Sequence, residues 1–191
     1  MVLAYHAIFS TYGFWLPNDP RGLWSEFVGS WELFWFGPAT KTDSRQSVAA
    51  AGHDRALRLA AKGALKYPPV EFSGRQALAT GQGFARACRE SGYVVHACSI
   101  LPNHVHAVIA RHEHEVERMV VHLKGRATQR LKTEGQWPQD DRPVWAKGCW
   151  RVYLNSAEDV RRAIAYVEAN PAKEGKPRQH WSFVTPFGAR V

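Results

Sequence analysis

The stretch that decides the fold is YVVHACSILPNHVHAVIA, residues 93–110. Its first eight residues (93–100) and its last seven (104–110) are rich in β-branched and other apolar residues, which favours two strands. Only Leu101, Pro102 and Asn103 separate them, and so short a connection is typical of an antiparallel hairpin. We therefore expect an antiparallel sheet that includes this hairpin.

Further elements are expected on both sides of the hairpin. Periodic apolar positions predict helices, and β-branched apolar runs predict strands, over the following ranges: strands at 2–10 and 144–154, and helices at 75–91, 114–133 and 156–170. Ser156 begins the last helix, with Asp159 three residues later as in a capping box. Asn170-Pro171 is expected to end it, because a residue before proline resists the α conformation.

The order of these elements is βαββαβ plus a final helix once residues 11–75 are set aside as an insertion rich in Gly, Pro and aromatic residues. This order predicts an α+β fold with a ferredoxin-like antiparallel sheet. We expect helices on one face, and an open face where chemistry or nucleic acid is placed. Residues 1–191 are expected to form a single domain that contains the insertion at 11–75.

The chain is strongly basic. Its 191 residues carry a formal net charge of +8, its isoelectric point is about 9.7, and it has eight tryptophans. A basic surface attracts polyanions, most commonly nucleic acid, and exposed aromatic rings would add stacking platforms for unpaired bases. The alternative is a small basic protein without a specific partner, whose tryptophans lie in the core.

Other sequence features indicate in which cellular compartment the protein is expected. No run approaches 18 uninterrupted apolar residues, and the N-terminus has neither a basic region nor a cleavage signature of a secretory signal. Three cysteines are an odd number at unrelated spacings, which makes neither a disulfide framework nor a zinc cluster. We expect a cytoplasmic protein with reduced thiols, associated with the nucleoid when it is bound to DNA.

Two histidines stand out on the second hairpin strand. His104 and His106 are two residues apart, so their side chains share one face of the strand. The opposite face is wholly apolar and is expected to face the core: Val105, Ala107 and Ile109. The histidines are therefore expected on the more open face.

The neighbours of these histidines leave room for a metal ion. If Ile100 and Asn103 close the turn, Ser99 lies opposite His104 and Ala97 lies opposite His106, and both neighbours are small. Two imidazoles are an incomplete divalent-metal site, and an oxygen ligand would suit Mg²⁺ or Mn²⁺. The alternative is two partly exposed polar residues without a metal.

The last helix offers a tyrosine and an amide one turn apart. With Val160, Ile164 and Val167 as its core positions, Tyr166 and Asn170 lie on the same flank. Arg162, one turn before Tyr166, could hold a phosphate. Taken alone, Tyr166 could equally be a boundary tyrosine and Asn170 a helix cap.

Together these residues fit one chemistry. The phenolate oxygen of a tyrosine can attack a phosphodiester, and a divalent ion held by histidines polarises the phosphate under attack. The phosphotyrosine bond conserves the energy of the phosphodiester, so rejoining needs no ATP. No GxxxxGK[ST] loop is present, which agrees with this.

Several motifs resemble one family. LPNHVH (101–106) resembles the PNHxH segment of the single-tyrosine HUH transposases, and of the REP-associated tyrosine transposases in particular. YVEANP (166–171) resembles the Y-x-x-x-N-P helix end of that family. The likeness extends to LKGR (123–126) and to the strand expected at 144–154, and covers about residues 93–175. Leu101 stands where the family usually has Met.

The resemblance implies a metal-dependent endonuclease and strand transferase acting on single-stranded DNA, usually with a hairpin. Tyr166 would be the nucleophile that forms a 5′-phosphotyrosine, and His104, His106 and Asn170 would hold Mg²⁺ or Mn²⁺. Both a monomer and a homodimer are open. Two alternatives are a non-catalytic DNA-hairpin-binding protein derived from such a transposase, and a phosphoesterase that uses water.

Further basic residues are candidates for DNA binding: Lys124, Arg126 and Arg130 on the helix at 114–133, and Arg21 among the insertion's Trp15, Trp24, Trp31 and Trp35. A solvated helix surface explains the first three equally well, and packing explains most of the tryptophans better. Other histidines are weighed similarly. His112 and His114 are interpreted as a solvated turn, His96 as a buried core residue, and His6 as a residue that could border the site.

Overall fold

The structure is a computed structural model that describes residues 1–14, 16, 33, 35–36 and 54–188. The chain divides into two compact units. The first, called the sheet unit below, consists of Met1–Ser10 and Glu71–Val191, and the second is Thr11–Val70. Arg21, Trp15, Trp24 and Trp31 lie outside the described residues.

The second unit contains one described helix, α2 (Arg55–Gly63). Asp54 caps it, because its side chain accepts a hydrogen bond from the backbone N–H of Leu57 at 2.9 Å. Leu16, Leu33 and Ala61 form a small buried cluster within this unit.

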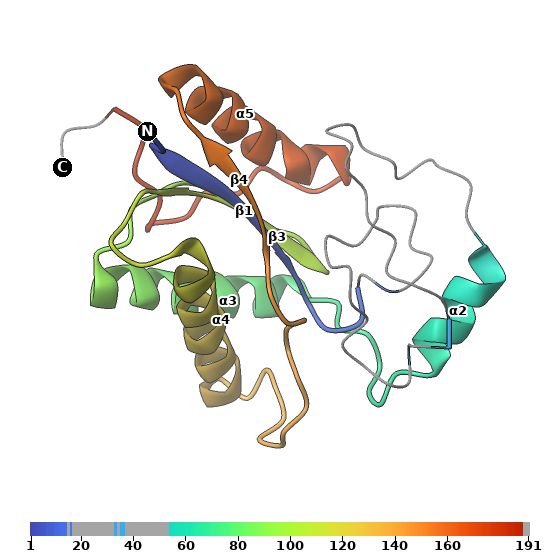
Figure 1. Cartoon of the computed structure of the whole chain (residues 1–191). Helices are drawn as coiled ribbons and strands as arrows, with labels where there is room; N and C mark the ends of the chain where they lie inside the picture. The colour runs from blue at the N-terminus through green and yellow to red at the C-terminus, as the bar shows by residue number, and fades with distance from the viewer. Residues whose placement is uncertain (15, 17–32, 34, 37–53, 189–191) are drawn as a thin grey trace. The chain divides into compact units, whose positions relative to one another are not determined.

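The sheet unit has the predicted order of strands and helices (Figure 1). Its elements are β1 (Ala4–Ser10), α3 (Gly74–Ser91), β2 (Val95–Ile100), β3 (His104–Ala110), α4 (Val116–Thr133), β4 (Trp150–Leu154) and α5 (Ala157–Lys173). The strands form one antiparallel sheet in the order β2-β3-β1-β4. This is the ferredoxin-like order, so the predicted α+β fold class is confirmed.

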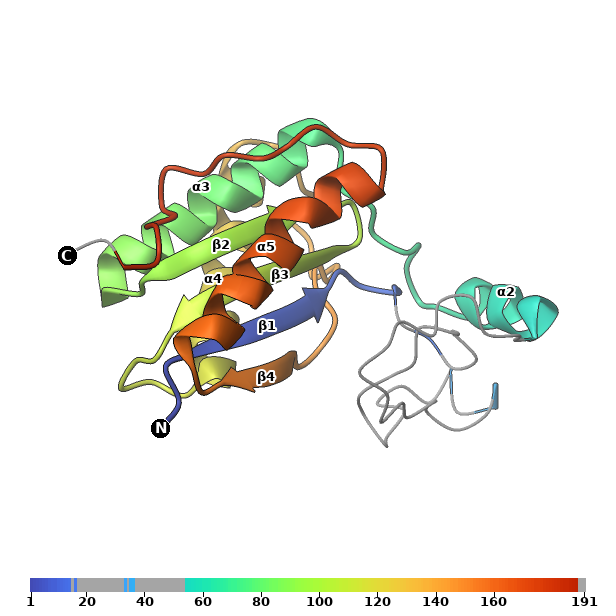
Figure 2. The same ribbon diagram turned by 90° about the horizontal axis from the view of Figure 1, so that it is seen from above.

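The helices lie on both faces of the sheet, and not on one face as expected. Figure 2 shows α5 over one face, with α3 and α4 behind the sheet. Val160 and Val167 of α5 pack on Val108 of β3 in one buried cluster. On the other face, the ring of Phe9 in β1 contacts Phe84 of α3, with ring centroids 5.9 Å apart.

The hairpin turn is tighter than expected. Leu101 donates its backbone N–H to the carbonyl of His104 at 2.9 Å, so only Pro102 and Asn103 form the loop. The pairs that follow are Ile100 with Val105 and Ser99 with His106.

Ala97 consequently pairs with Val108. The expectation that Ser99 lies opposite His104 and Ala97 opposite His106 was therefore wrong by two residues. Both neighbours remain on the face that carries the histidines, because a shift of two residues preserves the face.

The last strand is shorter than the predicted 144–154. It begins only at Trp150, because the side chain of Lys124 holds the preceding segment through hydrogen bonds to its backbone carbonyls. Lys124 of α4 donates from Nζ to the carbonyls of Ala146 and Gly148, at 2.9 and 2.5 Å. Gly148 has a φ of 71°, a left-handed conformation that glycine adopts without strain.

The last helix does not end at Asn170-Pro171 but continues to Lys173. Its start is as predicted, with the reciprocal capping box of Ser156 and Asp159. Pro171 lies inside the helix and has no N–H to donate to the carbonyl of Val167, four residues earlier. The hydroxyl of Ser99 donates to that carbonyl instead, at 2.5 Å. This replacement removes part of the usual cost of a proline within a helix.

Candidate active site

The two histidines of β3 lie on the face covered by α5. His106 pairs with Ile8 of β1 and His104 pairs with Ser10, so both histidines share a face with His6. His106 is buried, whereas His104 is half-buried. Their ring centroids lie 4.9 Å apart, which confirms that the two side chains point the same way.

A third histidine joins them from β1. Nε2 of His6 lies 3.0 Å from Nδ1 of His106, and the two ring centroids are 5.2 Å apart. Sequence patterns indicated His6 only as a residue that could border the site. The pairing of β1 with β3 brings it in, although 100 positions separate the two residues along the chain.

Burial keeps this histidine pair neutral. It lowers the pKa of His6 to about 4. It also lowers the pKa of His106 well below the usual value, aided by charge repulsion from His104, His6 and Lys173. At neutral pH both imidazoles therefore have a lone pair, the form in which histidine binds metal ions.

The orientation of His104 is also fixed by a neighbour. Its Nδ1 lies 2.9 Å from Oδ1 of Asn103, the residue that precedes it in the turn. Since an amide oxygen can only accept, Nδ1 is the donor in this hydrogen bond, and Nε2 is the ring nitrogen left to face a ligand.

Tyr166 reaches this cluster from α5. Its ring centroid lies 5.7 Å from that of His6 and 5.7 Å from that of His106. The side chain is 45% exposed, so the phenol is accessible to a large substrate. Nζ of Lys173 lies 4.4 Å from the centroid of the same ring. Sequence patterns did not indicate Lys173, because the helix was expected to end three residues earlier.

Asn170 is on the same helix, one turn after Tyr166, and is 7% exposed. Its Nδ2 is buried without a hydrogen-bond partner among the residues that the structure describes. A buried amide without a partner is costly, and such groups are commonly satisfied by a ligand or water. Because Nδ2 is a donor, the missing partner is an acceptor such as water or a phosphate oxygen, whereas a metal ion would bind Oδ1.

The donor set agrees with a divalent metal ion in part. Within the described part of the chain, no three His, Cys, Asp or Glu side chains are grouped to hold one. The side chains proposed as ligands from the sequence are the imidazoles of His104 and His106, whose rings lie side by side on β3, and the amide of Asn170 on α5, so they offer two nitrogens and one oxygen. Such a mixed set suits Mn²⁺, and it suits Mg²⁺ if water fills the remaining positions.

The other predicted DNA contacts are placed elsewhere. Arg162 lies on the first turns of α5, where it contacts Asp159 at 2.5 Å and Glu158 at 4.0 Å. Arg126 and Arg130 lie on α4, which packs on the opposite face of the sheet. Lys124 is buried with its ammonium bound to two carbonyls, and burial lowers its pKa to about 8. The ammonium group of Lys124 therefore binds backbone carbonyls inside the fold.

Two interpretations of the remaining histidines were wrong. His96 is only half-buried and contacts the carbonyl of Thr185 at 2.9 Å, because a register shift in β2 between Val95 and Ala97 displaces it. His112 and His114 are half-buried rather than solvated. Both pack against the ring of Tyr93, with centroids 4.9 and 6.0 Å apart.

Comparison with known proteins assigns the chain to a family. Residues 68–170, more than half of the sequence, match the model of the IS200-like transposases. The chain therefore belongs to the IS200-like transposase family. No curated protein matches it.

Two solved structures are similar to the chain. One is a REP-associated tyrosine transposase bound to a REP hairpin, with 19% identity, a TM-score of 0.47, and 62% of this chain and 70% of that chain covered. The other is a putative transposase from Deinococcus radiodurans R1, with 14% identity, a TM-score of 0.40, and 94% of each chain covered. Among the described residues, no helix is both long and apolar enough to cross a membrane.

Proposed function

We propose that the chain is a metal-dependent endonuclease and strand transferase that cuts and rejoins single-stranded DNA through Tyr166. The observation that carries this proposal is the position of the Tyr166 ring, 5.7 Å from the rings of both His6 and His106. Membership of the transposase family supports DNA as the substrate and transposition as the process.

The reaction is a transesterification. Oη of Tyr166 attacks the phosphorus, the bond from phosphorus to the 3′ oxygen breaks, and a 5′-phosphotyrosine and a free 3′-OH result. The phenolic proton leaves to water, and the departing 3′ oxygen takes up a proton. In rejoining, a 3′-OH attacks the phosphotyrosine and releases Tyr166, so the number of phosphodiester bonds is conserved.

His104, His106 and Asn170 would hold Mg²⁺ or Mn²⁺, which supplies Lewis-acid polarisation of the phosphate when bound. His6 positions His106. When Nδ1 of His106 donates to Nε2 of His6, Nε2 of His106 keeps the lone pair that a metal ion would need. Partners of this kind fix the tautomer and the ring orientation of metal-binding histidines.

Lys173 stabilises the attacking group. A cation 4.4 Å from the ring centroid favours a ring that carries negative charge over a neutral one. Its charge also contributes to attraction of the DNA backbone toward the neutral pair of His6 and His106.

A denaturing gel tests this function. Labelled single-stranded DNA carrying a hairpin is incubated with Mn²⁺ and the full-length protein. We expect a covalent protein–DNA band that disappears in Tyr166→Phe, in His104→Ala and with EDTA. Tyr153→Phe is the matched control, because Tyr153 is 49% exposed and lies on β4, where its ring packs against Tyr5.

The outcomes separate the alternatives. Cleavage that persists in Tyr166→Phe without a covalent band would establish a phosphoesterase that uses water. Tight hairpin binding without cleavage, under every metal and sequence tried, would establish a non-catalytic hairpin-binding protein. Mn²⁺ binding followed by electron paramagnetic resonance, weakened in His104→Ala, tests the metal site independently of cleavage.

A further inference from the structure

Three apolar side chains lie beside the candidate active site, on the same face of the sheet. Ile8 of β1 pairs with His106 on one side and with Trp150 of β4 on the other. Val152 of β4 pairs with His6. Because paired residues share a face of an antiparallel sheet, Ile8, Trp150 and Val152 continue the surface that the histidines form. These three side chains are called the apolar floor below.

The apolar floor is accessible although β1 is an inner strand of the sheet. Ile8 is the one residue of β1 that is half-buried and not buried. Trp150 is also half-buried, and Val152 is 42% exposed. A contiguous group of exposed apolar side chains is typical of a binding surface.

The path of α5 leaves this floor open (Figure 2). The helix begins near β1 and β4, where Val160 packs in one buried cluster with Leu154. It then crosses the sheet obliquely toward β2, where the carbonyl of Val167 accepts a hydrogen bond from Ser99. The middle of β4 is therefore not beneath α5. Tyr166 lies at the boundary between the histidines that α5 covers and the floor that it leaves open.

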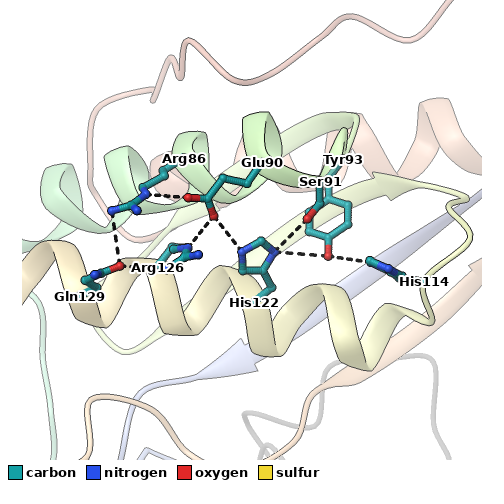
Figure 3. A network of polar contacts seen from close by, with 8 residues as sticks. All are labelled: Arg86, Glu90, Ser91, Tyr93, His114, His122, Arg126 and Gln129. Carbon is teal, nitrogen blue, oxygen red and sulfur yellow. Dashed lines mark hydrogen bonds and ion pairs between the residues drawn. The ribbon is translucent and has the colours of Figure 1, made fainter.

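A cation lies at the same boundary. Nζ of Lys173 is 4.4 Å from the centroid of the Tyr166 ring. Arg151, the neighbour of Trp150 along β4, points to the opposite face of the sheet and pairs there with a glutamate of α4. The arginines that bind Glu90 between α3 and α4 also lie on that opposite face (Figure 3). An anionic part of a ligand is therefore attracted to the Tyr166 side, and a flat uncharged part fits the floor.

We infer that the apolar floor seats the base of an unpaired nucleotide next to the phosphate that Tyr166 attacks, with this base stacked on the indole of Trp150. Ile8 and Val152 extend the apolar contact around the indole. Neighbouring strands are about 4.8 Å apart, so Trp150 lies about 10 Å from His106, within reach of a flanking nucleotide. The inference rests on the proposed function, because it takes single-stranded DNA as the substrate.

Trp150 binds and positions the strand in this arrangement. A single strand has many conformations, and holding one base fixes the adjacent phosphate relative to the phenol of Tyr166. Because a paired base is already stacked within its duplex, the floor favours unpaired DNA at the point of cutting. Stacking is available to every base, so this contact does not require a particular sequence.

The test is fluorescence anisotropy of the full chain in EDTA, which prevents metal-dependent cleavage. The probes are a labelled oligothymidylate and a strand of the same length whose sugar–phosphate backbone carries no bases. We expect Trp150→Ala to weaken oligothymidylate binding about tenfold, the size of one lost base–aromatic stack, and to change binding of the abasic strand less than about twofold. Trp150→Phe should stay within about threefold of the natural protein, because a phenyl ring still stacks. Tyr153→Ala is the matched control, since Tyr153 is 49% exposed on the opposite face of the same strand.

Unchanged oligothymidylate binding in Trp150→Ala would overturn the floor. An equal loss on the abasic strand would also overturn it, because Trp150 would then act on the structure and not on a base. If Trp150→Ala proves unfolded by thermal melting, Val152→Asp is compared with Tyr153→Asp, which adds the same charge on the other face. Val152→Asp should weaken oligothymidylate binding about fivefold more, through repulsion of the nearby phosphates, and equal effects would refute the floor.

This binding assay requires neither a metal ion nor cleavage, so its outcome is separate from that of the denaturing gel. A covalent adduct together with oligothymidylate binding that ignores Trp150 refutes the floor alone. A Trp150 effect on oligothymidylate without any adduct refutes the proposed chemistry alone.

Discussion

The hydroxyl of Ser99 in β2 and the carbonyl of Val167 in α5 are joined by a hydrogen bond of 2.5 Å. Val167 follows Tyr166 directly. Its carbonyl would normally accept a hydrogen bond from the backbone N–H of residue 171, but Pro171 has no N–H. Ser99 in turn pairs with His106 across the sheet. One buried serine thus connects the strand that holds the histidines to the helix turn that holds the tyrosine.

Ser99→Ala should lower the free energy of unfolding by about 1–3 kcal/mol, because it leaves a buried carbonyl without a donor. In a Pro171→Ala background the same substitution should cost less than half as much, since an alanine at that position supplies the missing backbone N–H. Chemical denaturation of the natural protein, Ser99→Ala, Pro171→Ala and the double variant measures the energetic coupling between residues 99 and 171. Equal costs of Ser99→Ala in both backgrounds would show that the proline does not create the need for the serine.

Gly83 and Gly125 provide a matched pair of helix glycines. A Cβ on Gly83 of α3 would lie 2.5 Å from Cα of Ala127 in α4, whereas a Cβ on Gly125 of α4 meets nothing within 4 Å. Gly83→Ala should destabilise by about 1–3 kcal/mol through overpacking of two backbones. Gly125→Ala should stabilise by up to about 1 kcal/mol through helix propensity. Urea unfolding of both variants checks the two signs, and a stable Gly83→Ala would disprove the close approach of α3 and α4.

The carboxylate of Glu90 gives the fold a dependence on acid pH. Hydrogen bonds from Arg86, and further ones from Arg126 and His122, lower its pKa to about 2. Because the pKa in the folded state is below the ordinary 4.5, the stabilisation is fully present above pH 4.5 and is lost as the pH falls toward 2. The melting temperature of Glu90→Gln should lie below that of the natural protein at pH 6, and the difference should shrink below pH 4.5. A constant difference across this range would contradict the ion-pair account.

Lys173 should affect the rate of the proposed cleavage more than DNA binding. Lys173→Met removes the cation over the Tyr166 ring and should slow adduct formation roughly tenfold, as expected for a cation–ring interaction of about 1–2 kcal/mol. Lys173→Arg should keep most of the rate. Single-turnover adduct formation at saturating DNA separates the two effects. An unchanged rate in Lys173→Met would show that the lysine has no part in the cleavage step.

The parts of the fold that follow from local patterns could be predicted from the sequence. Alternation along 104–110 placed His104 and His106 together on one face, and the capping box at Ser156 marked the start of α5. The strand order followed from short connections and element order. These are short-range effects, in which neighbours along the chain determine the conformation.

The rest depended on contacts that no local pattern encodes. His6 entered the site through the register of β1 on β3, which is set by long-range pairing. Lys173 came within reach of Tyr166 because a serine from another strand allowed the helix to pass Pro171. Lys124 looked like a surface cation in sequence, yet carbonyls of a distant loop bury it.

The position of β1 also sets the time at which the site can form. This strand is the first of the sheet to be synthesised, yet it lies between β3 and β4, the last two strands of the sheet to be made. His6 and His106 can meet only after 100 further residues have been synthesised and that distant pairing has closed. The nucleophile arrives later still, on a helix whose core contacts are to the completed sheet. A chain that is unfolded, or that has not yet made α5, therefore lacks at least the nucleophile, and the proposed nuclease activity arises only once Tyr166 has joined the folded sheet.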